Sequence, residues 1–176
     1  METSTARVAL KWGLLTALVG ILIKSLEYSQ EAYNSPLYST LTLAVFVGGL
    51  VLAMREFRTQ NGGYMTYGEG LGIGVLMFAI IGLLNVSYTM FYQTVIDPDM
   101  NAKVLEQARE QLEKANLPGS LAEKMDEAME EAADEPQKGF RGLTFIAGIF
   151  MQIFWGFILS LIVSGFMSRK KTNPFD

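Results

Sequence analysis

The sequence predicts an all-α fold: a polytopic membrane protein with four transmembrane helices and an extramembrane helical hairpin between spans 3 and 4. Half of the 176 residues are hydrophobic and only 18% are charged, a balance that favours a membrane protein with a soluble appendage over a soluble domain. The charge is unevenly placed, because residues 97–142 hold twelve acids and six bases, a net charge of −6, whereas the whole chain carries −4. We therefore expect a single membrane domain, residues 1–176, with one acidic loop outside the bilayer.

Four segments are long and apolar enough to cross the hydrocarbon core, which takes about 20 residues of helix. They are residues 8–28, 37–54, 70–96 and 143–167. The third and fourth contain no Asp, Glu, Lys or Arg. The first is interrupted, since Lys11 and Lys24 leave only twelve uncharged residues between them. Lysines near helix ends can place their amines at the interface while their stems stay in lipid, so this segment is also predicted to span.

The first segment could instead be a cleaved signal peptide, with Arg7 and Lys11 as its charged start. Residues 23–30, which follow its apolar part, offer no small-residue cleavage site. The sequence therefore favours a retained span.

Basic residues beside the spans predict the orientation. Arg7 and Lys11 precede the first span, Arg55 and Arg58 follow the second, and residues 169–171 follow the fourth, whereas the link 29–36 has no base. Short cytoplasmic segments carry an excess of Lys and Arg. We therefore expect both termini in the cytoplasm and the acidic loop outside, in the periplasm if the protein lies in a bacterial inner membrane.

The acidic loop has the pattern of two helices. Asp97 and Pro98 predict a helix start, the segment 117–119 (Leu-Pro-Gly) ends that helix, and Ser120 with Glu123 predicts a capping box for a second one. Two interpretations stay open: the helices pack on each other or on the bilayer surface, or they form an adaptor for a basic periplasmic partner. The acids available to an adaptor are Glu123, Asp126, Glu127, Glu130 and Glu131.

A glycine-rich stretch opens the third span. It lacks the Lys-Ser/Thr of a phosphate loop, and it leads into an apolar span rather than following a strand, so a nucleotide site is not indicated. Spacing of four residues places Gly70 and Gly74 on one face, and Gly68 and Gly72 on another. Small residues at this spacing let membrane helices approach closely, so both faces are predicted to pack against neighbours.

The fourth span repeats this small-residue signal. Gly148 and Gly156 share a face with Gln152 and Trp155. A Trp at mid-span, away from the interface, predicts that this face is buried in protein. Asn85 and Gln152 are the amides deep in the spans, at depths that would allow a hydrogen bond between them.

Charged residues also lie at the edges of the spans. Glu69 starts the third span near Arg55 and Arg58, and three roles stay open for it: an interfacial acid at a helix N-terminus, a salt bridge, or a proton-coupling carboxylate. Lys24 and Glu27 are predicted to form a local ion pair.

The chain has no cysteine and no histidine. Thiol and imidazole chemistry and most transition-metal sites are thereby excluded, and we expect no cofactor, no metal and no enzyme activity. No basic stripe is present that would indicate nucleic-acid binding.

The order of motifs resembles the domain-of-unknown-function family 4199. The resemblance rests on a basic link, Gly-Gly-Tyr-Met-Thr-Tyr-Gly at 62–68, Val-Ile-Asp-Pro at 95–98, a charged helical loop, and a last span ending in Ser-Arg-Lys-Lys at 168–171. It implies a small four-span membrane protein of Bacteroidetes-type bacteria, with no assigned activity or site residues.

Together these observations predict a non-catalytic structural or accessory protein of the membrane, whose surroundings are lipid and whose partners are copies of itself or another membrane protein. The alternative is a small oligomeric transporter or channel that uses Glu69, Asn85 and Gln152.

Overall fold

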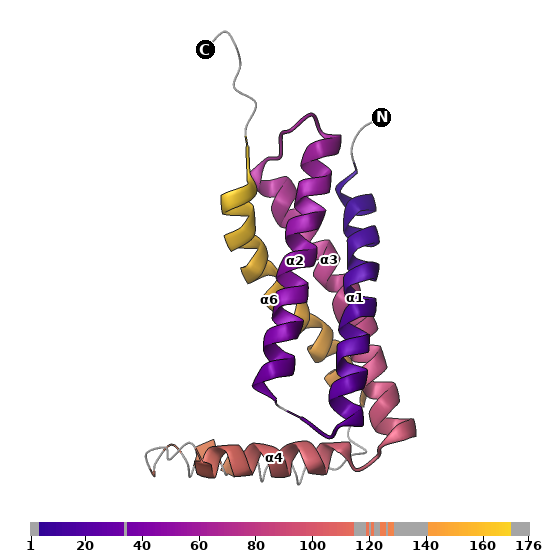
Figure 1. Ribbon diagram of the computed structural model, residues 1–176, viewed down its shortest axis with the longest axis vertical. Helices are drawn as coiled ribbons and strands as arrows, with labels where there is room; N and C mark the ends of the chain where they lie inside the picture. Colours follow the sequence, from indigo (N-terminus) through magenta and orange to yellow (C-terminus); the bar gives the residue numbers. More distant parts are fainter. Residues whose placement is uncertain are drawn as a thin grey trace.

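The computed structural model describes residues 4–33, 35–114 and 141–169, together with 119, 121, 124–125 and 127–128. Four long helices stand side by side, and a fifth lies across one end of them (Figure 1). The elements are α1 (Thr5–Ser29), α2 (Pro36–Gln60), α3 (Tyr67–Phe91) with its π-helical extension η1 (Tyr92–Ile96), α4 (Met100–Lys114) and α6 (Arg141–Met167).

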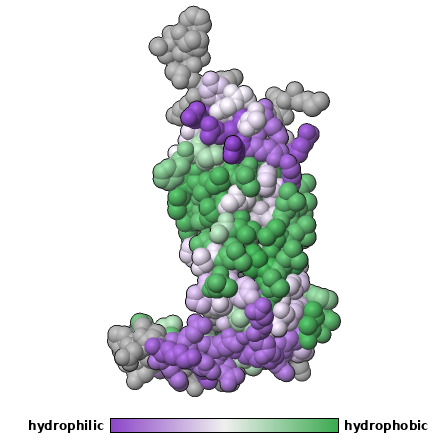
Figure 2. Space-filling view, in the orientation of Figure 1, coloured by the Kyte–Doolittle hydropathy of each residue, from purple (hydrophilic) through white to green (hydrophobic). Residues whose placement is uncertain are grey.

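The four long helices correspond to the four predicted spans. By length and composition each can cross a membrane, over Thr5–Ser29, Pro36–Gln60, Tyr67–Ile96 and Gly142–Met167. Figure 2 shows an apolar band across the middle of one face of the bundle, with polar residues at both ends. The second helix runs six residues beyond its predicted end at Met54, because the charged residues that end the apolar run do not interrupt helical hydrogen bonding.

The two ends of the bundle differ in their connections. At one end, which we call the basic end, lie the start of α1, the link from α2 to α3, and the end of α6 (Figure 1). Gly62 and Gly63 turn the chain there with φ of +68° and +90°. Met65 and Arg169 exchange backbone hydrogen bonds of 3.1 and 2.8 Å, which join this link to the end of α6. At the opposite end α4 lies across the bundle.

The helix α3 is central, since it packs on α1 and on α6, while α2 packs mainly on α1. The core contains side chains from α2 and α3 that are fully buried, among them Leu50, Met54, Ile73, Met77 and Ile81.

The predicted helical hairpin is only partly within the described residues. Its first helix is present as α4, but it begins at Met100 rather than beside Asp97. The predicted start at Pro98 was two residues early: Asp97 closes η1, with its N–H donating to the Tyr92 carbonyl at 2.9 Å, and its own carbonyl accepts from the Met100 N–H at 3.2 Å. The second predicted helix, from Ser120, lies largely outside the described residues.

Candidate functional sites at the helix interface and the two ends

The interface between α3 and α6 is a ladder of small residues. Each step of four residues forward along α3 is matched by a step of four residues back along α6. Every pair contains a glycine, and in most pairs a Cβ added to that glycine would overlap the other residue. The pairs, starting from the basic end, are Gly70 with Ser164, Gly74 with Ser160, Phe78 with Gly156, Gly82 with Gln152, and Val86 with Gly148. Small residues at a spacing of four let the two helices approach closely along this length, and α6 runs obliquely to the other helices in Figure 1.

The predicted glycine faces have different surroundings. Gly70, Gly74, Gly148 and Gly156 all belong to the ladder. A Cβ on Gly68 or on Gly72 would meet nothing within 4 Å, so that face of α3 is open in a single copy of the chain.

Sequence reasoning missed the partners of these glycines. Ser160 and Ser164 are fully buried against α3, and Gly49 of α2 packs on Thr16 of α1 in the same way. The signal was the spacing of four residues from Gly156 to Ser160 and Ser164, since serine is as suitable as glycine for close helix contact.

The two amides lie on different sides of α3. Asn85 is buried facing α1, where its Oδ1 lies 3.2 Å from the position a Cβ of Gly20 would take. Its Nδ2 donates to the Ile81 carbonyl at 3.0 Å, and its Oδ1 has no hydrogen-bond partner. The stem of Gln152 packs on Gly82 from α6. The hydrogen bond that the depths allowed is therefore not formed.

Trp155 is 56% exposed in the described structure, so the prediction of a buried face was wrong for this residue, although Gly148, Gln152 and Gly156 of the same predicted face do pack on α3. A ring that faces lipid tails is already in an apolar solvent, and its mid-span position therefore carries no information about protein contacts.

At the basic end, Glu56 joins α1 to α2. Its Oε2 accepts from Lys11 Nζ at 2.7 Å and from Trp12 Nε1 at 2.8 Å, and Gln60 donates to Oε1 at 2.9 Å. Sequence reasoning did not single out Glu56. The available signal was its place as the one acid in the basic segment 55–58.

Glu69 lies in a capping box at the start of α3. Thr66 Oγ1 accepts from the Glu69 N–H at 3.2 Å, and Glu69 Oε2 accepts from the Thr66 N–H at 2.7 Å. Its carboxylate is thus occupied by the helix end that it caps.

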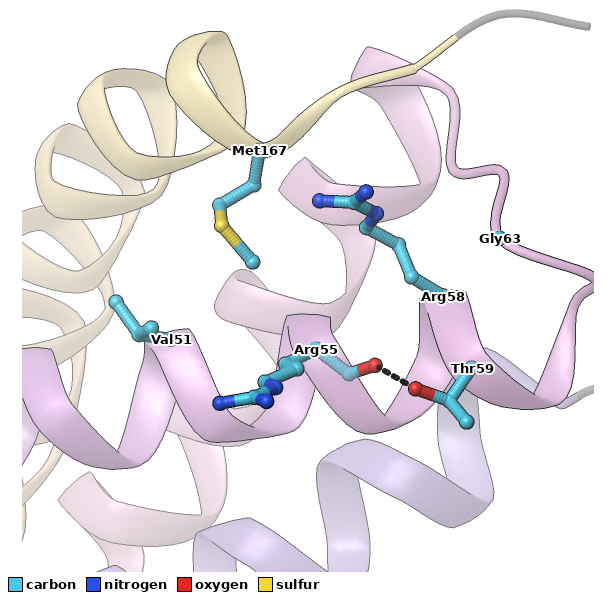
Figure 3. A pocket seen from close by; sticks show the side chains of 6 residues that line it. All are labelled: Val51, Arg55, Arg58, Thr59, Gly63 and Met167. Carbon is cyan, nitrogen blue, oxygen red and sulfur yellow. Dashed lines mark hydrogen bonds between the residues drawn. The ribbon is translucent and has the colours of Figure 1, made fainter.

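Arg55 and Arg58 line a groove of about 430 Å³ between α2, the following turn and the end of α6. Its other lining residues are Val51, Thr59, Gly63 and Met167. Arg58 extends toward the end of α6, and the Thr59 hydroxyl donates to the Arg55 carbonyl at 3.0 Å (Figure 3). The Nε of Arg58 is buried and has no hydrogen-bond partner.

At the opposite end, tyrosines from three elements form a cluster that we call the tyrosine cluster: Tyr28, Tyr33, Tyr88 and Tyr92. The rings of Tyr28 and Tyr88 are stacked with centroids 6.2 Å apart, and the Tyr28 and Tyr92 centroids are 4.7 Å apart. Met100 of α4 is buried against this cluster. The first loop helix is thus attached to the bundle by apolar contact.

Lys103 adds a charged attachment for α4. Its Nζ lies 2.8 Å from Glu31 Oε1 and 3.0 Å from Asp97 Oδ2, and Asp97 also accepts from the Tyr33 hydroxyl at 3.1 Å. The Lys103 hydrogen bond holds the pKa of Asp97 below its usual value, and Glu31 and Asp97 raise the pKa of Lys103. Burial, with the Asp97 hydrogen bond, raises the pKa of Tyr33 to about 12.

The predicted ion pair of Lys24 with Glu27 is not among the salt bridges of the described residues. Lys24 Nζ instead lies 3.4 Å from the Tyr28 hydroxyl and 5.7 Å from the centroid of that ring.

The arrangement defines a class: an all-helical protein whose four long apolar helices are consistent with a multi-pass membrane protein. The chain belongs to the family described as Protein of unknown function (DUF4199), whose sequence profile matches residues 9–169. This confirms the family resemblance predicted from the sequence. No curated protein and no solved structure matches the chain.

Proposed function

We propose that this chain is a non-catalytic structural protein of the membrane, which associates with a second copy of itself through the open face of α3. One observation carries the proposal. Of the two glycine pairs on α3, Gly70 and Gly74 are covered by α6, whereas Gly68 and Gly72 have nothing within 4 Å of an added Cβ. Each pair has the spacing at which membrane helices approach closely.

The open face continues along the helix as a shallow apolar groove of about 400 Å³. It is lined by Ala6 and Leu10 of α1 and by Leu76, Ala79, Ile80 and Leu83 of α3. A face of small residues on one helix can pair with the same face of a second copy around a two-fold axis. This two-fold pairing supports association with a second copy over association with another membrane protein.

The carrier alternative has less support from the geometry. Glu69 caps a helix at the basic end, Asn85 faces α1, and Gln152 faces α3 from α6. None of the three lines either groove, and core side chains such as Leu50 and Met77 between them are fully buried. A transport path would need polar groups that share a water-filled cavity.

We further propose a bacterial inner membrane as the location, with the basic end in the cytoplasm. The structure brings Lys11, Arg55, Arg58 and Arg169 to one end of the bundle, as the positive-inside tendency requires of cytoplasmic segments. The acidic loop would then face the periplasm, where a basic partner is a further expectation.

Cysteine crosslinking tests the association directly, because the chain has no cysteine of its own. A Gly72→Cys variant in native membranes is expected to give a disulfide-linked dimer, since the Cα atoms of a disulfide lie within about 7 Å. The matched control is Leu52→Cys, a 44% exposed position on α2 outside this face. Equal crosslinking of both variants, or none at Gly72→Cys, would contradict the proposal. A linked product of another mass would show that the face binds a different protein.

A further inference from the structure

The groove at Arg55 and Arg58 combines an apolar wall with two cations. Val51 lies one helical turn before Arg55 on α2, and Met167 closes the groove from the end of α6. Arg58, Thr59 and Gly63 line the side nearer the connecting link. Apolar groups toward the middle of a span and cations at its end follow the polarity of a phospholipid, from acyl chain to phosphate.

The two arginines are not neutralised within the described part of the chain. Neither has a salt bridge there, and the Nε of Arg58 is buried without a hydrogen-bond partner. The nearest acid in sequence, Glu56, is already bound to Lys11 and Trp12 of α1. An unpaired guanidinium beside an apolar wall favours a bound anion, which would meet the terminal guanidinium nitrogens because the Nε of Arg58 is itself enclosed.

The groove also has room for a headgroup. Gly63 contributes no side chain to its wall, and nothing lies within 4 Å of the position a Cβ would take there. Guanidinium groups present planar pairs of N–H donors that match the oxygens of a phosphate.

We propose that this groove binds the phosphate of an anionic glycerophospholipid, with Arg55 and Arg58 on the phosphate and with Val51 and Met167 against the acyl chain. Free phosphate shares the anion chemistry but does not use the apolar wall. The inference is independent of the proposed self-association, because that association uses the Gly68 and Gly72 face of α3, which does not line this groove.

The test measures lipid binding to the full chain in detergent micelles by native mass spectrometry. Phosphatidylglycerol is expected to bind more tightly than phosphatidylcholine, and an Arg55→Gln/Arg58→Gln variant to bind phosphatidylglycerol at least about tenfold more weakly, since a hydrogen bond to a charged group contributes about 1.5–3 kcal/mol. The control is Arg7→Gln, which removes one charge, against two in the double variant, from an exposed site at the same end and should keep at least about half of the affinity.

One further variant and one competition experiment separate phospholipid binding from loss of the fold and from binding of free phosphate. Arg58→Lys retains the charge but loses the planar pair of N–H donors, so it is expected to weaken binding about tenfold even if the double variant does not fold. Inorganic phosphate at millimolar concentration is expected not to displace the lipid. Equal binding of the two lipids, equal losses in the Arg7 and Arg58 variants, or full displacement by inorganic phosphate would overturn the proposal.

Discussion

Gly74 is a position where an added side chain would disrupt the contact between α3 and α6. An added Cβ would lie 2.6 Å from Ser160 Cβ and would also overlap its hydroxyl. We therefore expect Gly74→Ala to lower the free energy of unfolding by about 1–3 kcal/mol, the usual cost of overpacking. Thermal unfolding in detergent, followed by circular dichroism, measures this loss.

The neighbouring glycine supplies the control. Gly72→Ala adds the same methyl group where nothing lies within 4 Å, and better helix propensity should make it neutral or stabilising by up to about 1 kcal/mol. Ser160→Gly introduced into Gly74→Ala should recover most of the loss, because it removes the overlapping group. If the two alanine variants lose equal stability, the ladder is not the cause.

Glu56 accepts from Lys11, Trp12 and Gln60, and the different exposure of the first two allows their contributions to stability to be ranked. Lys11 is 54% exposed at its side chain, so Lys11→Met should change stability by no more than about 1 kcal/mol. Glu56→Leu also leaves the part-buried Trp12 Nε1 without its acceptor at 2.8 Å, which costs a further 1–3 kcal/mol or so. Urea or thermal unfolding of the two variants measures the difference, and a larger loss from Lys11→Met would contradict this account.

At the scale of elements, the attachment of α4 should depend on pH. The pKa of Asp97 is lowered by Lys103, so its contribution is present above the ordinary Asp pKa of about 3.9 and is lost as pH falls through the lowered value. The pKa of Lys103 is raised, so its contribution is complete below about 10.4 and is lost at higher pH. The pKa of Tyr33 is raised to about 12, so its neutral hydroxyl also favours attachment, and this contribution is lost as pH rises through that value.

We therefore expect the attachment of α4 to be strongest between about pH 4 and pH 10 and to weaken progressively outside that range. A spin label on Glu106→Cys, an exposed site on α4, would report the change as increased mobility. Lys103→Gln should raise the mobility at neutral pH as well. A label on Leu18→Cys of α1 is the control and should stay unchanged. A mobility at Glu106 that is flat from about pH 2 to about pH 12 would contradict the attachment by these groups.

The elements that the sequence predicted are those encoded locally. Hydropathy located the four long helices because an apolar stretch of that length has few alternatives. The Thr66 to Glu69 capping box, which was not predicted, also lies within four residues and is a local signal of the same kind. Contacts between elements were not predictable in this way. Lys103 meets Glu31 and Asp97 only because the π-helical turn and the link 29–36 bring them together, and Ser160 meets Gly74 only once α6 has packed on α3.

At the scale of the whole molecule, the basic end sets the expected orientation. The chain's lack of cysteine allows single-cysteine labelling in intact cells. Asn61→Cys in the basic link should be protected from a membrane-impermeant maleimide, whereas Glu113→Cys at the end of α4 should react. Permeabilised cells should label both. The reverse pattern would place the basic end outside, against the positive-inside tendency.

The four long helices differ in how many neighbours they pack on, and this difference determines which face of α3 stays open. The helices α1, α2 and α3 share the core, while α6 attaches chiefly to α3 through the ladder. The sequence showed two glycine faces on α3 but could not say which one α6 would cover. That assignment leaves Gly68 and Gly72 free for a neighbour, and it is the basis of the proposed self-association.

The most direct test of that association is resonance energy transfer between donor- and acceptor-labelled copies in lipid vesicles. The wild-type chain is expected to show transfer that depends on the protein-to-lipid ratio and falls when unlabelled chain is added. A Gly68→Leu/Gly72→Leu variant should keep its fold, since nothing lies within 4 Å of either added Cβ, but should lose most of the transfer. Transfer that is equal in the wild-type chain and the variant, or absent from both, would contradict self-association through the Gly68 and Gly72 face.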